Sequence, residues 1–343
     1  MDRQNLTSQR RTTIYDLAQR LGTSPSAVSS VLNGSWRKRR ISETLANRVL
    51  QAAEETGYAP NIQASALRRD RSNIVGMIVP KYDNRFFGAV AERFEQAVRA
   101  NGQFPVITCT QRDPALELEA ARGLLSYQVD CLVACGATDP DRIAELCHAS
   151  GVPTINLDLP GSKAPSVISD SYSAARDLTR LILDACTRDL GLTGALTFVG
   201  GRLDDHNTKE RRRGFVDAHA ERGITVPAGN IIMPGYAAER ARAALEALPE
   251  RPRGLFVNST IALEGVVHWI QSLDPDEAAA IRYGTFDFDP FGALLPQSVG
   301  MVQQDVDSLI SEMLRQMRKG PGAPAVVREV PCILRARADH ISA

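Results

Sequence analysis

The sequence lacks long apolar runs and paired metal-binding motifs. No stretch approaches the roughly 18 residues of a membrane-spanning helix, and the first 20 residues hold no hydrophobic core of a secretion signal. The six cysteines are scattered, and Cys131 and Cys135 fall in a predicted strand rather than in a Cys-x-x-Cys pair. We therefore expect a cytoplasmic protein with reduced, buried thiols and no metal site.

The motifs of common enzymes are also missing. The sequence contains no GxSxG, HExxH, GxxxxGK(S/T) or GxGxxG pattern. The five histidines are scattered along the chain, and His206, which lies near a predicted pocket, has no visible nucleophile as a partner. We predict that the chain is not an enzyme and uses no cofactor.

A net charge of zero hides an uneven distribution. Residues 1–72 contain twelve Lys and Arg against six Asp and Glu, and the remaining chain holds 28 against 34. A basic head on an acidic body indicates that the head binds a polyanion. On charge alone, a head that is merely solvated is the alternative.

At 343 residues with 43% hydrophobic residues, the chain can form two or three compact units. From Ile74 onward, apolar strands alternate with amphipathic helices, which is typical of parallel sheets covered on both faces. The predicted strands cover 74–79, 104–110, 131–134, 154–157, 195–199, 231–233, 254–257 and 299–302. Two doubly wound parallel sheets fit this α/β body better than one.

The first sixty residues predict an all-α head. Ile14, Leu17 and Leu21 share one helix face, and Gly22 ends that helix. Ser24 is a suitable N-cap for a second helix that starts at Pro25 and ends at Asn33-Gly34, and Ser42 is a suitable cap for a third helix that runs to Gly57. The first two helices form a helix-turn-helix.

The segments TTIYDLAQRLGTSPSAVSSVLNG, TGYAPNIQASALR and SNIVGMIVP resemble the lactose repressor (LacI/GalR) family of transcriptional regulators, and the likeness continues to the end of the chain. The loop SWRKRR resembles the fructose repressor (catabolite repressor/activator) branch. The resemblance implies two body subdomains of periplasmic-binding-protein type, a homodimer on pseudo-palindromic operator DNA, and allosteric control by a small sugar or sugar phosphate, with fructose type favoured.

The head supplies the candidate DNA-binding residues. Ser26, Ala27, Ser29 and Ser30 are expected on the outer face of the second helix, and the four cations from Arg37 to Arg40 are expected to hold phosphates. By the resemblance, Pro25, Ser26 and Ser30 touch bases, and Leu67 of a hinge helix enters the minor groove. Packing of Leu67 on the neighbouring domain is the alternative. The full set is Thr13, Tyr15, Ser24, Pro25, Ser26, Ala27, Ser29, Ser30, Asn33, Arg37, Lys38, Arg39, Arg40, Tyr58, Asn61, Ala64 and Leu67.

Ligands of doubly wound domains bind at the carboxyl ends of the strands. Polar and aromatic side chains that follow the predicted strands are therefore candidates for holding a polyhydroxylated molecule. The predicted effector-binding residues are Asn84, Phe86, Phe87, Asp158, Asn207, Arg211, Asn258 and Asp287. By the resemblance, Arg211 contacts the effector. Asn84 has helix capping as its alternative role, and Arg212 and Arg213 are expected to be surface charges.

We predict a DNA-binding domain over 10–60 and a hinge helix with linker over 61–72. The first body subdomain is expected to comprise 73–168 and 304–324, and the second 169–303 and 325–338. The helix around Phe94 and Val98 is a candidate dimer surface, with core packing as the alternative. A sugar-binding protein of a transport system would share the body fold, but the attached helix-turn-helix argues against it.

Overall fold

A computed structural model describes residues 12–58 and 71–337. The chain divides into two compact units, Met1–Ser72 and Asn73–Ala343, which we call the head and the body and describe separately. The predicted hinge residues Asn61, Ala64 and Leu67 lie outside the described residues. Among the described helices, none is both long enough and apolar enough to span a bilayer.

The described residues of the head form three helices, α1 (Ile14–Leu21), α2 (Pro25–Leu32) and α3 (Glu43–Glu55). Gly22 ends α1 in the left-handed region at φ 65°, which glycine adopts without steric cost. Ser24 and Ser42 cap α2 and α3 through their side-chain oxygens, as predicted. Leu17 of α1, Val28 of α2 and Val49 of α3 are fully buried in one shared core. This minimal core fixes the angle between α1 and α2.

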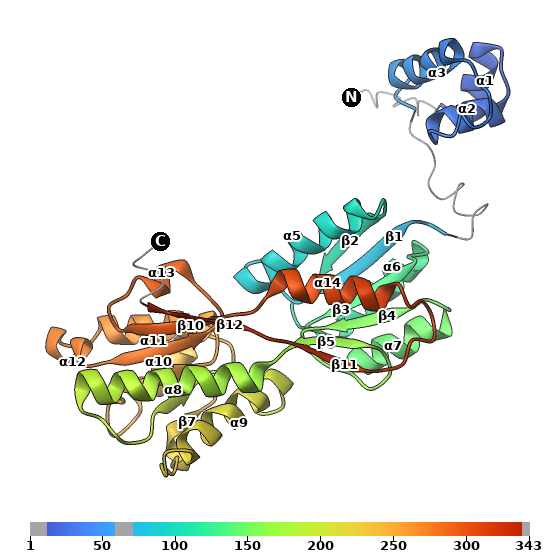
Figure 1. Ribbon diagram of the computed structural model, residues 1–343. Coiled ribbons are helices and arrows are strands. Elements are labelled where there is room, and N and C mark those ends of the chain that lie inside the picture. The colour runs from blue at the N-terminus through green and yellow to red at the C-terminus, as the bar shows by residue number, and fades with distance from the viewer. Residues whose placement is uncertain (1–11, 59–70, 338–343) are drawn as a thin grey trace, which may run out of the picture. The chain divides into compact units, whose positions relative to one another are not determined.

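The first body sheet has the strand order β11-β5-β4-β3-β1-β2 and is parallel throughout. Helices α5 and α14 pack with β1 and β3 in one core, and α6 and α7 pack in a second core on the opposite face (Figure 1). The strands are β1 (Ile74–Val79), β2 (Phe104–Cys109), β3 (Cys131–Cys135), β4 (Thr154–Leu157), β5 (Ser166–Ser169) and β11 (Val327–Val330). The helices are α5 (Arg85–Ala100), α6 (Pro114–Ser126), α7 (Pro140–Ala149) and α14 (Val306–Met317).

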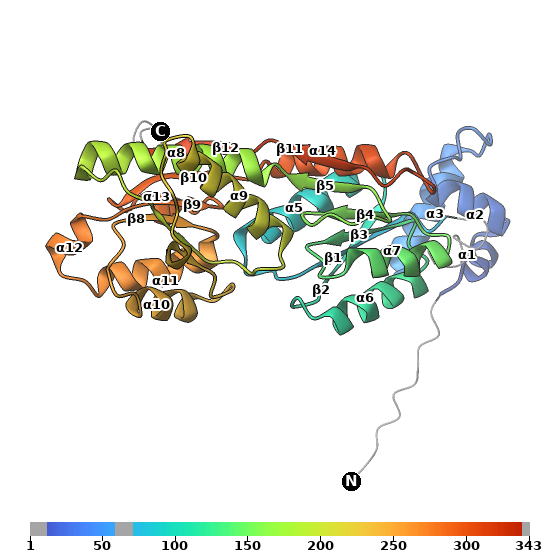
Figure 2. The ribbon, with the colours of Figure 1, turned by 90° about the horizontal axis from the view of Figure 1, so that it is seen from below.

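The second body sheet has the order β12-β10-β9-β8-β6-β7, and its edge strand β12 runs antiparallel to β10. Helices α8 and α9 cover one face and α10 and α11 the other (Figure 2). The strands are β6 (Thr197–Val199), β7 (Ile231–Ile232), β8 (Gly254–Val257), β9 (Arg282–Phe286), β10 (Ser298–Gln303) and β12 (Ile333–Ala336). The helices are α8 (Ser171–Leu190), α9 (His206–Ala220), α10 (Ala238–Glu246), α11 (Thr260–Gln271), α12 (Pro275–Ala279) and α13 (Pro290–Ala293), with a 3-10 turn at Ala228–Asn230.

The predicted fold class is confirmed, and each predicted strand has a counterpart within two residues at either end. The sequence prediction omitted β5, β9, β11 and β12. It also assigned 325–338 to the second subdomain, whereas β11 pairs with β5 in the first sheet and β12 alone joins the second. Both strands carry Arg and are largely exposed, so they lack the apolar signal of a central strand.

The two sheets are joined by three crossover segments, β5 to α8, β10 to α14 and β11 to β12. Residues that follow strands of both sheets, such as Asp158 after β4 and Asp287 after β9, line one common cleft. Phe94 and Val98 of α5 are fully buried in the core of the first sheet. They serve core packing and are not available to a second copy of the chain.

Candidate functional site

The first turn of α2 presents short polar side chains. Ser26 is exposed, and its hydroxyl lies 2.9 Å from that of Ser24, which also accepts from Ala27 N. Ser29 is half-buried, and its hydroxyl accepts a hydrogen bond from Asn33 Nδ2 at 3.2 Å. Side chains of this size permit close approach to a groove floor.

Ser30 differs from the expectation that it faces outward. It is 5% exposed, and its Oγ donates to the Ser26 carbonyl oxygen at 2.8 Å. A serine inside a helix can satisfy its hydroxyl on the preceding turn, and a buried position favours that bond. The expectation of an outward-facing Ser30 is therefore wrong for the described conformation.

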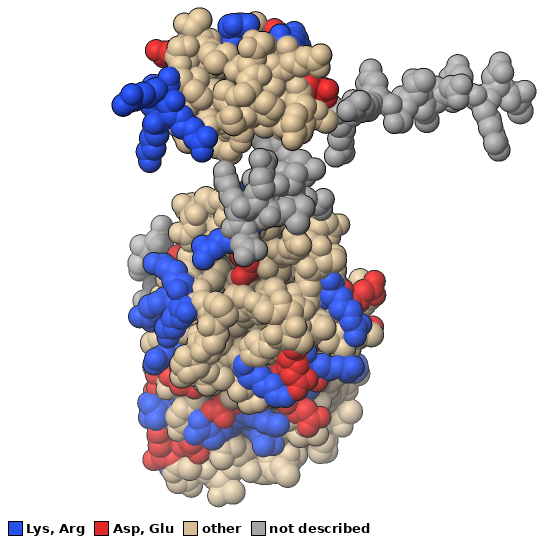
Figure 3. Space-filling view, turned by 90° about the vertical axis from the view of Figure 1, so that its right-hand side faces the viewer, with Lys and Arg blue, Asp and Glu red and all other residues tan. Residues whose placement is uncertain are grey.

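A basic turn precedes α3. Arg37, Lys38, Arg39 and Arg40 are all exposed, and Arg40 has a left-handed backbone at φ 55°. The turn is held by Trp36, whose carbonyl oxygen accepts from Arg39 N and Ile41 N and whose ring packs on the core of the head. Figure 3 shows Lys and Arg side chains projecting from one side of the head. A rigid turn with four exposed cations can follow a phosphate backbone.

The remaining predicted residues of the head have mixed environments. Tyr15 is 71% exposed at the start of α1. Thr13 caps α1 in a capping box with Asp16, so its hydroxyl is already engaged. Tyr58 packs partly against the core of the head.

The body contains a cleft between its two sheets with an empty volume of about 500 Å³, partly open to solvent. Seven of the eight predicted residues line it. Its full lining is Lys81, Asn84, Phe86, Phe87, Arg112, Asp158, Asp205, Asn207, Arg211, Tyr236, Ser259, Ile261, Asp287 and Gln304. Three cations, three carboxylates, three amides and aromatic rings thus surround one space.

Asn258 is the exception among the predicted residues. It is fully buried, its Nδ2 donates to Thr208 Oγ1 at 3.3 Å, and its carbonyl oxygen accepts from Arg211. Asn84 has both roles considered for it, because it caps α5 through Phe86 N and Phe87 N while lining the cleft.

Arg211 of α9 is 3% exposed and rigidly held. Its Nη1 donates to Asn258 O at 2.7 Å, and its guanidinium lies 3.6 Å from the ring centroid of Phe286. Its Nε has no hydrogen-bond partner among the described residues. A planar, oriented cation with an unused donor is suited to a polar ligand.

The pKa values of two carboxylates of the cleft are shifted in opposite directions. Burial raises the pKa of Asp158 to about 6, with Asp205 and Asp287 adding to the rise and Arg112 and Arg211 opposing it. Burial also acts to raise the pKa of Asp205, but hydrogen bonds from Tyr236 and Thr208 outweigh it and lower that pKa overall. Of these two carboxylates, Asp158 is therefore the one that titrates closer to neutrality.

Sequence reasoning missed Lys81, Arg112, Asp205, Tyr236, Ser259, Ile261 and Gln304. Arg112 follows β2 in a left-handed conformation at φ 59°, and its guanidinium lies 5.5 Å from the Phe87 ring and 5.3 Å from the Tyr236 ring. It thereby links the two sides of the cleft. Applying the strand-end rule to β2 would have found Arg112, because it lies three residues after that strand.

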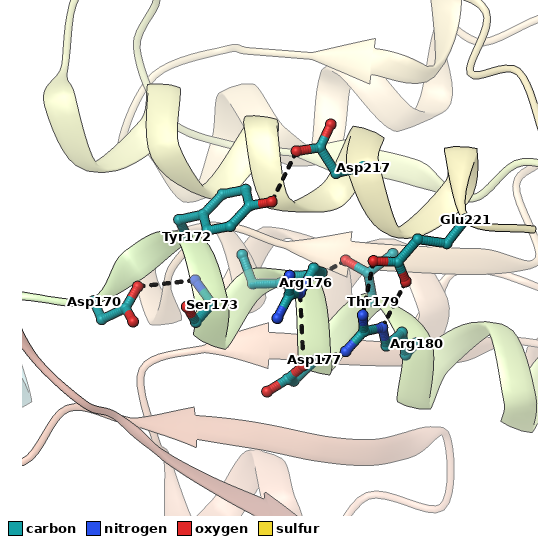
Figure 4. Close-up of polar contacts among 10 residues, drawn as sticks. Asp170, Tyr172, Ser173, Arg176, Asp177, Thr179, Arg180, Asp217 and Glu221 are labelled. Carbon is teal, nitrogen blue, oxygen red and sulfur yellow. Dashed lines mark hydrogen bonds and ion pairs between the residues drawn. The ribbon is translucent and has the colours of Figure 1, made fainter.

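Arg213 lies outside the cleft, as expected for a surface charge. It pairs with Glu210, and its guanidinium stacks 3.8 Å from the Tyr172 ring centroid. Figure 4 shows the adjoining contacts between α8 and α9, where Tyr172 Oη donates to Asp217 at 2.9 Å and Arg180 forms a two-pronged pair with Glu221. These contacts fix α9, and hence Arg211, against α8.

Two family models match the chain. Residues 13–61 match the bacterial regulatory proteins of the lacI family, and residues 75–293 match the periplasmic binding protein domain. The ribitol operon repressor of Klebsiella aerogenes is 58% identical over 193 residues, which are 56% of this chain and 72% of that protein. The fructose operon regulatory protein of Vibrio cholerae is 30% identical over 88% of this chain and 92% of that protein.

Solved structures show the same fold. The lac repressor dimer bound to operator and the anti-inducer ONPF gives a TM-score of 0.76 at 21% identity, covering 96% of this chain and 99% of that one. The Cra regulator of Pseudomonas putida with fructose 1-phosphate gives 0.66 at 20% identity, covering 77% and 98%. A helix-turn-helix head on a two-sheet body with a polar cleft defines a ligand-responsive DNA-binding regulator. The chain belongs to the lacI family of bacterial regulatory proteins.

Proposed function

We propose that this protein represses an operon for the use of a small polyol, and that a polyol of ribitol type, bound in the cleft, controls its affinity for operator DNA. The cleft, with its buried Arg211 and its carboxylates on both sides, is the observation that carries the proposal. The similarity to the ribitol operon repressor of Klebsiella aerogenes supports the choice of polyol.

The polar atoms of the cleft favour an uncharged ligand with many hydroxyls. Asn207 Oδ1 is a buried acceptor without a hydrogen-bond partner among the described residues. Asp158 and Asp287 add carboxylate oxygens, which only accept while ionised. A hydroxyl can donate to each of these acceptors and still accept from Arg211 Nε, whereas an anion can only accept.

A fructose-type sugar or sugar phosphate is the second candidate. Lys81 and Arg112 line the cleft in addition to Arg211, so cations are present for an ester phosphate. The similarity to the fructose operon regulatory protein of Vibrio cholerae supports it.

For DNA, we propose that two copies of the chain place their α2 helices in the two halves of a pseudo-palindromic operator. Ser26 and its neighbours would face base edges, and the basic turn from Arg37 to Arg40 would contact phosphates. The hinge helix proposed for 61–68 would connect these contacts to the body.

Fluorescence anisotropy with the DNA upstream of its own gene tests the function. We expect salt-sensitive, sequence-specific binding that changes when ribitol is added, with fructose and fructose 1-phosphate as comparison ligands. Binding that responds to fructose 1-phosphate and not to ribitol would select the second candidate. Polyol binding without specific DNA binding would refute the regulator and indicate a carrier.

A further inference from the structure

Gln304 connects the cleft to the crossover segments through two short hydrogen bonds. Its Nε2 donates to Asp287 Oδ1 at 2.6 Å, and its Oε1 accepts from Ser169 Oγ, also at 2.6 Å. Gln304 is 5% exposed and Ser169 is 4% exposed, so water competes little for either bond. Asp287 itself lines the cleft.

The chemistry of Asp287, Gln304 and Ser169 fixes the direction of the two hydrogen bonds that link them. An ionised carboxylate only accepts, so the amide nitrogen of Gln304 must face Asp287. The amide oxygen then faces Ser169, whose hydroxyl must donate. Rotating the amide by 180° would place Gln304 Oε1 against the Asp287 carboxylate, and two acceptors cannot form a hydrogen bond. The loss of that bond disfavours the rotated form and holds the side chain in one orientation.

The hydrogen-bonded residues Ser169 and Gln304, with their neighbours, reach all three crossover segments. Ser169 ends β5 at the first segment, and Gln304 follows β10 at the second. Cys332 of the third segment places its Sγ 3.9 Å from the carbonyl oxygen of Asp170, the residue after Ser169. A change in the angle between the two sheets must alter the backbone at these segments, because no other described segment of the body joins the sheets covalently.

We propose that Gln304 is a positioning residue: it orients the Asp287 carboxylate for the effector and, through Ser169, couples occupation of the cleft to the crossover segments. This proposal rests on the proposed function. An effector hydroxyl that donates to Asp287 in this orientation stabilises the arrangement in which both bonds of Gln304 persist. Any conformation in which Ser169 and Asp287 separate must break one bond, and the effector therefore disfavours it.

Two substitutions separate the two roles. Gln304→Met keeps the length of the side chain and removes both bonds, so we expect the dissociation constant for ribitol to rise about 10-fold or more. Ser169→Ala leaves the Gln304 bond to Asp287, so ribitol affinity should stay within about 3-fold. The ratio of operator affinities with and without saturating ribitol should nevertheless fall by about 3-fold or more.

Matched controls are available for both. Gln316 of α14 is 2% exposed, is hydrogen-bonded to Glu312 and Lys319, and does not line the cleft. Gln316→Met therefore makes the same change without affecting the hydrogen bonds of Gln304. Ser171 lies two residues from Ser169, and its Oγ has no hydrogen-bond partner among the described residues, so Ser171→Ala removes no protein bond. Neither control should change ribitol affinity or the ratio.

Calorimetry for ribitol and anisotropy for operator decide the outcome, with fructose 1-phosphate as the probe if the wild type responds to it instead. Equal effector affinity in Gln304→Met and Gln316→Met overturns the positioning role. An unchanged ratio in Ser169→Ala overturns the coupling, and that measurement decides alone if Gln304→Met does not fold. If operator binding by the wild-type protein changes with neither ligand, the proposed function itself is refuted. That measurement does not depend on the variants, so the two failures can be told apart.

Discussion

The guanidinium of Arg211 is held by Asn258: its Nη1 donates to the Asn258 carbonyl oxygen at 2.7 Å, while the Phe286 ring lies 3.6 Å from its centre. Both partners follow or end strands of the second sheet, so the sheet itself orients the cation toward the cleft. The buried Nε of this group has no hydrogen-bond partner among the described residues.

We expect Arg211→Ala to weaken effector binding by about 100-fold, because a charge-assisted hydrogen bond and an oriented cation are lost together. Operator affinity without effector should remain within a few-fold of wild type. Calorimetry and anisotropy measure the two properties. Arg212→Ala, at a half-exposed neighbour, is the control. Loss of DNA binding in Arg211→Ala would show a structural arginine instead.

Asp158→Asn should stabilise the protein and lower its affinity for the effector. Burial raises the pKa of Asp158 to about 6 from 3.8, so the folded state loses stability as pH rises through this window. The full cost, on the order of 3 kcal/mol, is present above pH 6. Asparagine keeps an acceptor for Asn207 Nδ2 and tolerates the left-handed backbone at φ 75°.

Thermal melts of this variant at pH 7.5 and pH 4 test the prediction. The gain in melting temperature should appear at pH 7.5 and vanish at pH 4, where the wild-type carboxyl is protonated. Ribitol affinity should fall about 10-fold at pH 7.5, since a carboxylate acceptor is lost. A gain in stability that is equal at both pH values would contradict the role of the buried charge.

The sequence was sufficient for the head helices and the central strands because their signals are local. Ser24 and Ser42 are caps with apolar periodicity behind them, and strands such as Ile74–Val79 are apolar throughout. β11 and β12 carry Arg at exposed edges, and their sheet membership depends on partners such as β5, far away in the chain. No local pattern contains that information.

The cleft was predictable where a residue directly follows a recognised strand, as Asp158 follows β4. Gln304 follows β10 directly, yet its role depends on Ser169 and Asp287, which arrive from other strands. Tyr236 lies in a loop four residues after β7, and its position beside Asp205 is a tertiary contact. Ser30 was misplaced because the helix register alone does not show how deeply a small side chain is buried.

An ion pair across the body should tune the effector response. Arg85 Nε of α5 lies 2.8 Å from Asp289 Oδ2, and α5 belongs to the first sheet whereas Asp289 caps α13 of the second. We expect Arg85→Ala to lower ribitol affinity by up to about 5-fold, because a half-exposed pair contributes little and only in this arrangement. Asp289→Asn, which keeps the oxygen that caps α13, should have the same effect. Affinities that match wild type at low salt would exclude this role.

The basic turn should contribute to DNA affinity through phosphates. We expect Lys38→Ala and Arg39→Ala each to weaken operator and non-specific DNA alike and to reduce the slope of log K against log salt by about 0.9. Anisotropy titrations at several salt concentrations give this slope. Arg251→Ala, which removes an exposed cation of the body paired with Glu277, is the control. Loss of specificity without a change of slope would identify a base contact.

Protonation of His219 should set the acid limit of body stability. His219 is fully buried on α9, and Leu196 N donates to its Nε2 at 3.0 Å, so Nδ1 carries the proton and donates to Phe215 O at 2.8 Å. Burial lowers the pKa of His219 below 6.5, with Arg222 acting in the same direction.

The unfolded chain therefore takes up this proton first as pH falls. The stabilising contribution of the neutral ring is complete above pH 6.5 and is lost as pH falls toward the lowered pKa. Because Asp158 adds stability as pH falls below about 6, the effect of His219 is measured as the difference between variant and wild type. We expect His219→Asn to lose less melting temperature than the wild type between pH 7 and pH 5, while costing stability at pH 7 through lost packing on Phe215. His148→Asn, at an exposed position, should follow the wild-type curve. A His219→Asn curve parallel to wild type would assign the acid loss to other groups.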